Sequence, residues 1–128
     1  LGLLDVETTI LPEKTVRFAE GTSHDGGEPV SGYEIHLGTT TGDDTARPML
    51  MLEGGRPDGA ISCDGQVMGC YMHGLFASDA YRSTWVRAAT GQSSSLDFEA
   101  GVDAGLEALA SHLESHADID AIARIAGL

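Results

Sequence analysis

The chain has 128 residues, and its 20 acidic and seven basic side chains give a net charge of −13 at pH 7. This charge, without any cluster of lysine or arginine, argues against nucleic acid or an anionic membrane as a partner. No apolar run reaches the roughly 18 residues of a membrane span and no signal peptide opens the sequence, so we expect a cytoplasmic protein. The hydrophobic share of 41% is enough to bury a core in one domain or in part of one.

The first 75 residues favour strands. Alternating side chains or short apolar runs predict strands at residues 14–20, 30–38 and 49–53. The polar stretches 21–29 and 39–48 predict loops between them.

Residues 60–72 predict a β-hairpin that turns at Asp64-Gly65, with residue 63 paired to 66 and residue 59 to 70. Cys63 and Cys70 would then lie roughly 13 Å apart along the ladder, too far for a disulfide. Neither cysteine has small residues two positions away on both sides, as a nucleophile elbow requires. We expect two reduced, structural thiols and no zinc site.

The last 50 residues favour helices. Residues 78–89 have an N-capping Ser78 and an amphipathic pattern, and residues 96–116 carry a longer apolar stripe. Residues 118–128 predict a short helix that Gly127 closes. Because strands cluster first and helices follow, the pattern predicts the second half of an α/β domain.

The fragment "GCYMHGLF" places His73 at the end of an apolar strand, directly before Gly74. Side chains at the carboxyl end of a strand in an open α/β sheet project into the crevice where ligands bind. His73 is therefore a candidate general base. The alternative is a histidine packed or hydrogen-bonded at a sheet edge.

The fragment "GYEIHLG" holds a second candidate, the pair Glu34 and His36. Two residues apart on a strand, their side chains share one face and could form a general-base pair or a substrate clamp. The alternative is the polar face of an edge strand, with Tyr33, Ile35 and Leu37 filling the core on the other side.

The remaining histidines, His24, His112 and His116, suggest no site. His112 and His116 are four residues apart on a predicted helix, but Glu114 falls on another face and no third ligand is evident. We expect a solvated helix face and no metal site.

In order and spacing, the runs "LGLLDVET", "GYEIHLGTT" and "DGAISCDGQVMGCYMHGLFASDAYR" resemble the C-terminal part of cobyric acid synthases, glutamine-dependent amidotransferases of cobalamin biosynthesis. The resemblance spans roughly residues 1–90 and is closest in 32–38 and 58–82. It implies the doubly wound α/β fold of a class I-like glutaminase domain, with residues 1–128 as its C-terminal part.

The resemblance also implies that His73, in the Y-x-H-G-L-F motif, is catalytic. The nucleophilic cysteine would lie upstream and not on this chain, so the chain alone is expected to be inactive. It would bind no cofactor itself, while ATP and Mg²⁺ would bind a missing synthetase domain. Glutamine would be one substrate, and a corrinoid, adenosylcobyrinic acid a,c-diamide, would be amidated through that missing domain.

Two positions depart from related patterns. Most class I glutaminases have a glutamate two positions after the histidine, where this chain has Leu75. We expect Glu34, from a neighbouring strand, to orient His73 or to contact substrate together with His36. Cys70 stands where the family more often has a small or hydroxyl residue, and we expect it to be structural.

Alternatives from the same fold remain. A cobyrinic acid a,c-diamide synthase is expected to have His and Phe in place of Tyr33 and Ile35, and a cell-wall amidating glutaminase subunit is a further relative. A non-catalytic module of this fold is the alternative from another class. A half-domain would also expose an apolar face, so a homodimer is a possible assembly.

Overall fold

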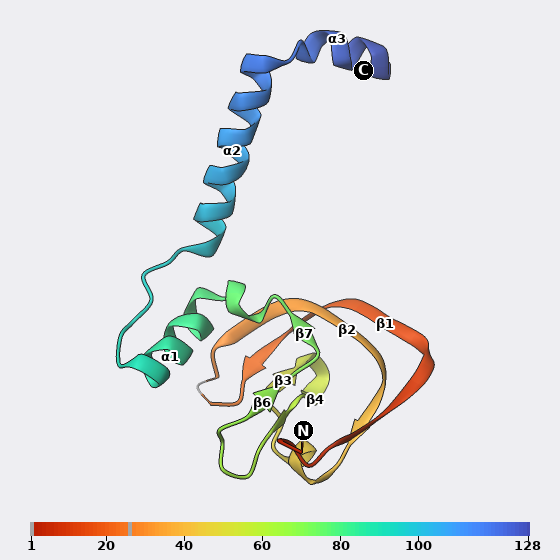
Figure 1. Ribbon diagram of the computed structural model, residues 1–128, viewed down its shortest axis with the longest axis vertical. Helices are drawn as coiled ribbons and strands as arrows, with labels where there is room; N and C mark the ends of the chain where they lie inside the picture. The colour runs from red at the N-terminus through yellow and green to blue at the C-terminus, as the bar shows by residue number, and fades with distance from the viewer. Residues whose placement is uncertain (1, 26) are drawn as a thin grey trace. The chain divides into compact units, whose positions relative to one another are not determined.

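The computed structural model describes residues 2–25 and 27–128. The chain divides into two compact units, one ending at Ser95 and the other comprising Leu96–Leu128. We call them the strand unit and the helical unit. Every strand described lies in the strand unit, and the long C-terminal helix lies in the helical unit (Figure 1). The predicted division into a strand-rich first half and a helical C-terminal part is confirmed.

The strand unit is built on a five-stranded sheet of order β4-β3-β1-β2-β7, in which each neighbouring pair is antiparallel. Its centre is the pair of long strands β1 (Glu7–Ser23) and β2 (Pro29–Thr41), which curve across the unit in Figure 1. The shorter members are β3 (Leu50–Leu52), β4 (Arg56–Asp58) and β7 (Met72–His73).

The long strands extend into stretches that were expected to be loops. β1 continues to Ser23 and β2 continues to Thr41, so the loop predictions for 21–29 and 39–48 are wrong at those ends. Two ladders cause these extensions: Thr22 and Ser23 of β1 pair with Met51 and Leu50 of β3, and Thr8 pairs with Thr40 of β2, where the two hydroxyls bond at 2.7 Å. β-Branched threonine fits a pleated strand although its side chain is polar.

The predicted hairpin forms with the expected register. Strands β5 (Ala60–Ile61) and β6 (Met68–Gly69) pair Ala60 with Gly69 and Ile61 with Met68. The ladder stops earlier than expected, because the Ser62 hydroxyl donates to Asp64 and the turn closes through Gly65 N–H to the Ser62 carbonyl.

Paired residues in antiparallel strands point to the same face, so the registers divide the sheet side chains into two sets. The core face carries Ala19, Val30, Leu50, Leu52 and Met72, all buried. The other side, which we call the outer face, carries large apolar side chains that are 42–58% exposed. These outer-face residues are Val16, Phe18, Tyr33, Leu37 and Met51.

The expectation that Tyr33, Ile35 and Leu37 fill the core is therefore wrong. Tyr33 and Leu37 are 56% and 46% exposed, whereas Glu34 is buried. The polar side of β2 faces inward because Arg17 of β1 and Arg56 of β4 neutralise the Glu34 charge there.

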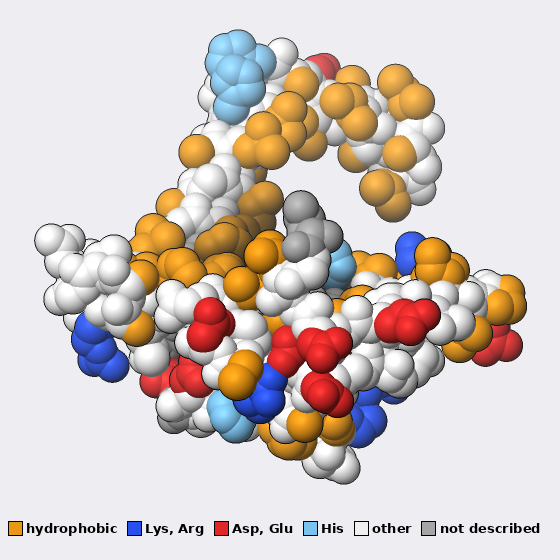
Figure 2. Space-filling view, turned by 60° about the horizontal axis from the view of Figure 1, so that its bottom comes forward, with side chains coloured by type: hydrophobic (Ala, Val, Ile, Leu, Met, Phe, Trp, Pro, Cys, Tyr) orange, Lys and Arg blue, Asp and Glu red, His pale blue; other side chains and the backbone are white. Residues whose placement is uncertain are grey.

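The helices follow their capping residues. α1 (Asp79–Thr90) begins after Ser78, whose hydroxyl accepts the Tyr81 N–H, and ends at Gly91 in the left-handed region. α2 (Phe98–His116) and α3 (Ile119–Ala126) begin after Asp97 and Asp118, each accepting a backbone N–H. All three predicted helices are confirmed, and Figure 2 shows hydrophobic side chains on the surface of the C-terminal helices.

Within the described residues, no helix combines the length and the apolar character that crossing a membrane requires.

Candidate functional site

His73 ends strand β7, as the sequence predicts. Gly74 follows with φ 88° and ψ 6°, the left-handed region in which glycine is favoured. The His73 side chain is exposed, and its pairing with Tyr33 puts it on the outer face. Among the residues that the structure describes, none makes a hydrogen bond to the His73 ring, so both ring nitrogens are open to an incoming group.

Gly32 explains how β7 comes so close to β2. A Cβ built on Gly32 would lie 2.1 Å from the carbonyl oxygen of His73, well inside contact distance. Only glycine allows the backbone carrying His73 to lie where it does. Sequence reasoning quoted the "GYEIHLG" stretch for its charged residues and missed this role of its first glycine.

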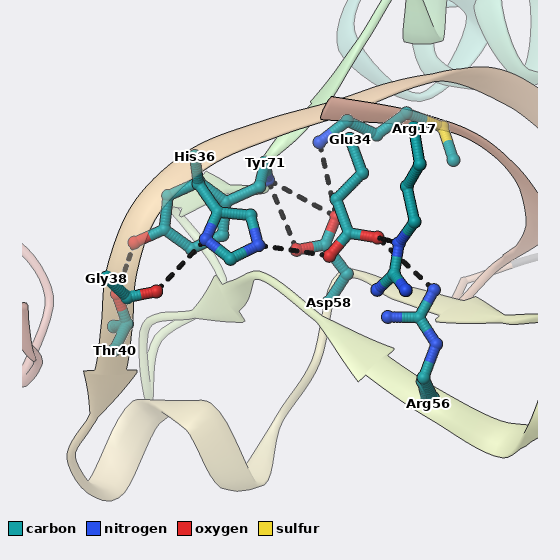
Figure 3. A network of polar contacts seen from close by, with 9 residues as sticks. Arg17, Glu34, His36, Gly38, Thr40, Arg56, Asp58 and Tyr71 are labelled. Atoms are coloured by element: carbon teal, nitrogen blue, oxygen red, sulfur yellow. Dashed lines mark hydrogen bonds and ion pairs between the residues drawn. The ribbon is translucent and has the colours of Figure 1, made fainter. Parts of the chain in front are cut away.

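Glu34 is the centre of a charged network on the core face (Figure 3). Its carboxylate accepts hydrogen bonds from Arg17 Nε at 2.7 Å, Arg56 Nη2 at 3.2 Å and His36 Nε2 at 3.1 Å. The bond from Arg17 is the main cause that lowers the pKa of Glu34 to about 2, against the opposing effect of burial. Glu34 is therefore ionised at neutral pH, and the two arginines compensate its buried negative charge.

His36 is held between two acceptors. Its Nε2 meets Glu34, and its Nδ1 lies 3.0 Å from the carbonyl oxygen of Gly38. The ring packs on Tyr71 with centroids 4.7 Å apart, and the Tyr71 hydroxyl bonds to Thr40.

Asp58, at the end of β4, is the second buried carboxylate. It accepts the backbone N–H of Tyr71 on both oxygens at 3.2 Å and that of Met72 on Oδ2 at 3.2 Å. Burial raises the pKa of Asp58, and these N–H groups partly oppose that rise. No strand was predicted at residues 56–58, and the only local signal for this role is an aspartate directly before Gly59.

The structure brings Glu34 and His36 together but does not bring Glu34 to His73. Tyr33 pairs with His73 and Glu34 pairs with Met72, so the Glu34 and His73 side chains lie on opposite faces. The Glu34 carboxylate is already bonded to two arginines and His36. The expected contact in which Glu34 orients His73 is thus absent from this structure. The reason is that successive side chains of a strand point to opposite faces, and Tyr33, not Glu34, shares the face of His73.

A cavity of about 500 Å³ opens on the core side, lined by residues that include Glu34, His36, Asp58 and Cys70. Both cysteines are free thiols, and Cys63 is exposed. Burial, with a smaller contribution from the Asp58 charge, raises the pKa of Cys70 to about 11. Cys70 is therefore protonated at neutral pH, which suits a structural thiol better than a nucleophile.

The other three histidines are His24 in the strand unit and His112 and His116 in the helical unit. His112 and His116 stack on α2 with ring centroids 4.2 Å apart, and His24 is exposed. In the part of the chain that the structure describes, no three His, Cys, Asp or Glu side chains gather in a way that could hold a metal ion.

Known proteins resemble this chain along almost all of its length. A cobyric acid synthase from Methylobacterium nodulans is 48% identical over 126 residues, which cover 98% of this chain and 26% of that protein. One from Hyphomonas neptunium is 54% identical over 121 residues, covering 94% of this chain and 24% of that protein. The chain thus spans about a quarter of the length of these curated relatives, and no solved structure matches it.

The sequence profile of the CobB/CobQ-like glutamine amidotransferase domain matches residues 1–81. This stretch contains the strand that ends at His73 and the network around Glu34. The chain therefore belongs to the family of CobB/CobQ-like glutamine amidotransferase domains.

Proposed function

We propose that this chain is the C-terminal part of the glutaminase domain of a cobyric acid synthase and that His73 is its catalytic base. The observation that carries the proposal is the position of His73. The residue ends a strand inside the matched 1–81 region, is exposed, and makes no hydrogen bond through its ring to any described residue. A general base needs a ring nitrogen that is free to accept the proton of the nucleophile.

The partner of His73 would come from the segment that covers the outer face. Phe18 lies edge-on to Tyr33 with ring centroids 5.7 Å apart, and Tyr33 is directly cross-strand from His73. An apolar surface of this kind normally packs against another part of a protein. A cysteine on the segment that packs there would be brought beside His73.

In the proposed reaction, His73 takes the thiol proton of that cysteine and the thiolate attacks the side-chain amide of glutamine. The C–N bond breaks as His73 returns the proton to the leaving ammonia, which leaves a glutamyl thioester. Water, deprotonated by His73, then attacks the thioester carbonyl, and glutamate leaves as the thiol is restored. Cys63 and Cys70 take no part in this cycle.

The ammonia would be used outside this chain. The names of the relatives support a parent enzyme that amidates a corrinoid. We propose that the remaining part of that enzyme binds ATP and Mg²⁺ and activates carboxylates of adenosylcobyrinic acid a,c-diamide for amidation.

The test is glutamine hydrolysis by the complete polypeptide carrying His73→Asn. We expect the rate to fall at least about 10³-fold, because both proton transfers lose their base. His24→Asn is the matched control, since His24 is also exposed but lies outside the site, and its rate should equal wild type. If His73→Asn keeps the wild-type rate while circular dichroism shows an intact fold, His73 is structural and a non-catalytic module becomes the better proposal.

The 128-residue chain by itself should release no ammonia from glutamine, because neither of its thiols is placed as the nucleophile. Ammonia release is measured for the chain and for its Cys63→Ala and Cys70→Ala variants. Activity that survives both substitutions would contradict the proposed mechanism.

A further inference from the structure

The two edge strands of the five-stranded sheet continue into the paired strands β5 and β6, and one side chain adds a further contact between the edges. In the strand order, β4 and β7 stand at opposite ends, separated by β3, β1 and β2. Asp58 of β4 nevertheless accepts the backbone N–H groups of Tyr71 and Met72, each at 3.2 Å. The sheet therefore curls until its edges approach, and the Asp58 carboxylate on β4 bonds to the backbone of Tyr71 and Met72 beside that hairpin (Figure 3).

This contact acts on the strand that carries His73. β7 is only two residues long and pairs with β2 through Tyr33–His73 and Glu34–Met72. Two pairs give a short strand little stability of its own. Asp58 binds the strand from the other edge, at Met72, the residue directly before His73.

Burying the ionised Asp58 carboxylate costs desolvation free energy, which its hydrogen bonds to backbone N–H groups offset only in part. Asp58 is 6% exposed and no ion pair of its carboxylate is seen among the described residues, so its charge is stabilised mainly by N–H groups. Its neighbour Glu34 is also an anion, which adds repulsion. An uncharged serine or asparagine would avoid much of this desolvation cost. Only a carboxylate, however, offers two acceptor oxygens to the N–H groups of Tyr71 and Met72.

We infer that Asp58 is a positioning residue for His73, because it fixes the backbone of β7 from the edge opposite β2. The inference rests on the proposed function, in which His73 is the base. Asp58 does not touch the reacting atoms, since Met72, not His73, shares the core face with it. Its effect on the rate comes through the placement of the imidazole.

The test uses the complete polypeptide with Asp58→Asn and Asp58→Ala. Asparagine keeps one acceptor oxygen and turns an NH₂ group toward a backbone N–H, so β7 shifts. We expect kcat for glutamine hydrolysis to fall about 10–100-fold while KM for glutamine changes less than about twofold, because misplacing a catalytic group by about 1 Å has effects of this size. Asp64→Asn is the matched control, since Asp64 also accepts a backbone N–H, together with the Ser62 hydroxyl, but only within the hairpin turn, and the kcat of this variant should equal that of wild type.

Amide hydrogen exchange separates positioning from general loss of fold. In the Asp58→Asn variant of the 128-residue chain, the amides of Tyr71 and Met72 should exchange faster, while those of β1 residues paired with β2, such as Thr15 and Ala19, stay as slow as in wild type. Unchanged kcat, or an equal loss of protection in β1, β2 and β7, would overturn the inference. If Asp58→Ala fails to fold, Asp58→Asn decides.

His73→Asn keeps the two proposals apart. If His73→Asn is inactive and Asp58→Asn has the wild-type kcat, the positioning role fails and the proposed function stands. If His73→Asn is fully active, the proposed function fails, and the positioning role fails with it even if the amides of β7 respond to Asp58→Asn.

Discussion

At the scale of single residues, Glu34 shows how this chain keeps a charge inside its core. Two arginines from different strands and one histidine from its own strand converge on a residue that is 5% exposed. Removing the carboxylate charge would take away the anion that both arginines bind, and water would solvate these half-exposed arginines only in part. Glu34 is thus better described as a structural ion than as a catalytic group.

The stability of the chain should therefore depend on Glu34 in acid. Its pKa is lowered from 4.5 to about 2, so its contribution is fully present above about pH 4.5 and is lost as pH falls toward 2. Glu34→Gln should cost about 2 kcal/mol of unfolding free energy at pH 7, since the arginine partners are half-exposed and screened. The measurement is urea unfolding at pH 7, 4 and 3 for wild type and variant.

The difference in unfolding free energy between wild type and Glu34→Gln should shrink as the pH falls from 7 to 3. The raised pKa of Asp58 acts in the opposite direction, and because the Glu34 charge is a smaller cause of that rise after burial, the difference also contains a lesser contribution from Asp58. Glu20→Gln, on the exposed part of β1, serves as the control and should show a difference near zero at each pH. A constant difference from pH 7 to pH 3 would contradict the role given to the Glu34 charge.

At the scale of elements, the sequence predicted the features that residues close together in the chain determine. It did not predict those that residues far apart in the chain determine. The helix caps Ser78 and Asp97 act within one turn, and the hairpin register follows from Asp64-Gly65, so these features were predictable. The inward side of β2 was not, because it depends on Arg17 and Arg56 from other strands. Apolar alternation gives the period of a strand, but it does not say which side meets the core.

The same reasoning applies to the site. His73 at a strand end before a glycine was predictable from local sequence. The clamp by Asp58 was not, because it joins residues 13 and 14 positions apart through backbone N–H groups that leave no mark on side-chain pattern.

The contact between β2 and β7 gives a test at this scale. Gly32→Ala should lower the unfolding free energy by about 2 kcal/mol or more, because its Cβ would meet the His73 carbonyl at 2.1 Å and push β7 away. Gly69→Ala is the matched control, a strand glycine whose Cβ would meet nothing within 4 Å, and should change stability by less than about 0.5 kcal/mol. Thermal and urea unfolding check both, and equal effects of the two substitutions would contradict the close approach.

At the scale of the whole molecule, the outer face and the net charge act against each other. Exposed apolar side chains on the outer face favour association, while a charge of −13 makes copies repel. Added salt screens the repulsion and leaves the apolar attraction. The balance between the two decides how the isolated chain behaves in solution.

We therefore expect the 128-residue chain to self-associate more at 0.5 M than at 0.05 M salt, and Phe18→Ser to weaken that association. Ile10→Ser is the control: Ile10 is 76% exposed but lies between Thr9 and Lys14, where the register shifts and the regular pairing is interrupted. Sedimentation velocity at several concentrations measures both variants. A compact monomer under all these conditions would show that the outer face does not drive association.

The alternation along β2 also offers a route for protein engineering. Residue 33 faces His73 directly across the strand pair, at the roughly 5 Å between Cβ atoms that cross-strand neighbours share. A carboxylate introduced there would stand beside the imidazole, where the native chain has an aromatic ring. Replacing Tyr33 by an acidic residue would thus create a histidine–carboxylate pair with His73 through one side-chain change and no change of the backbone.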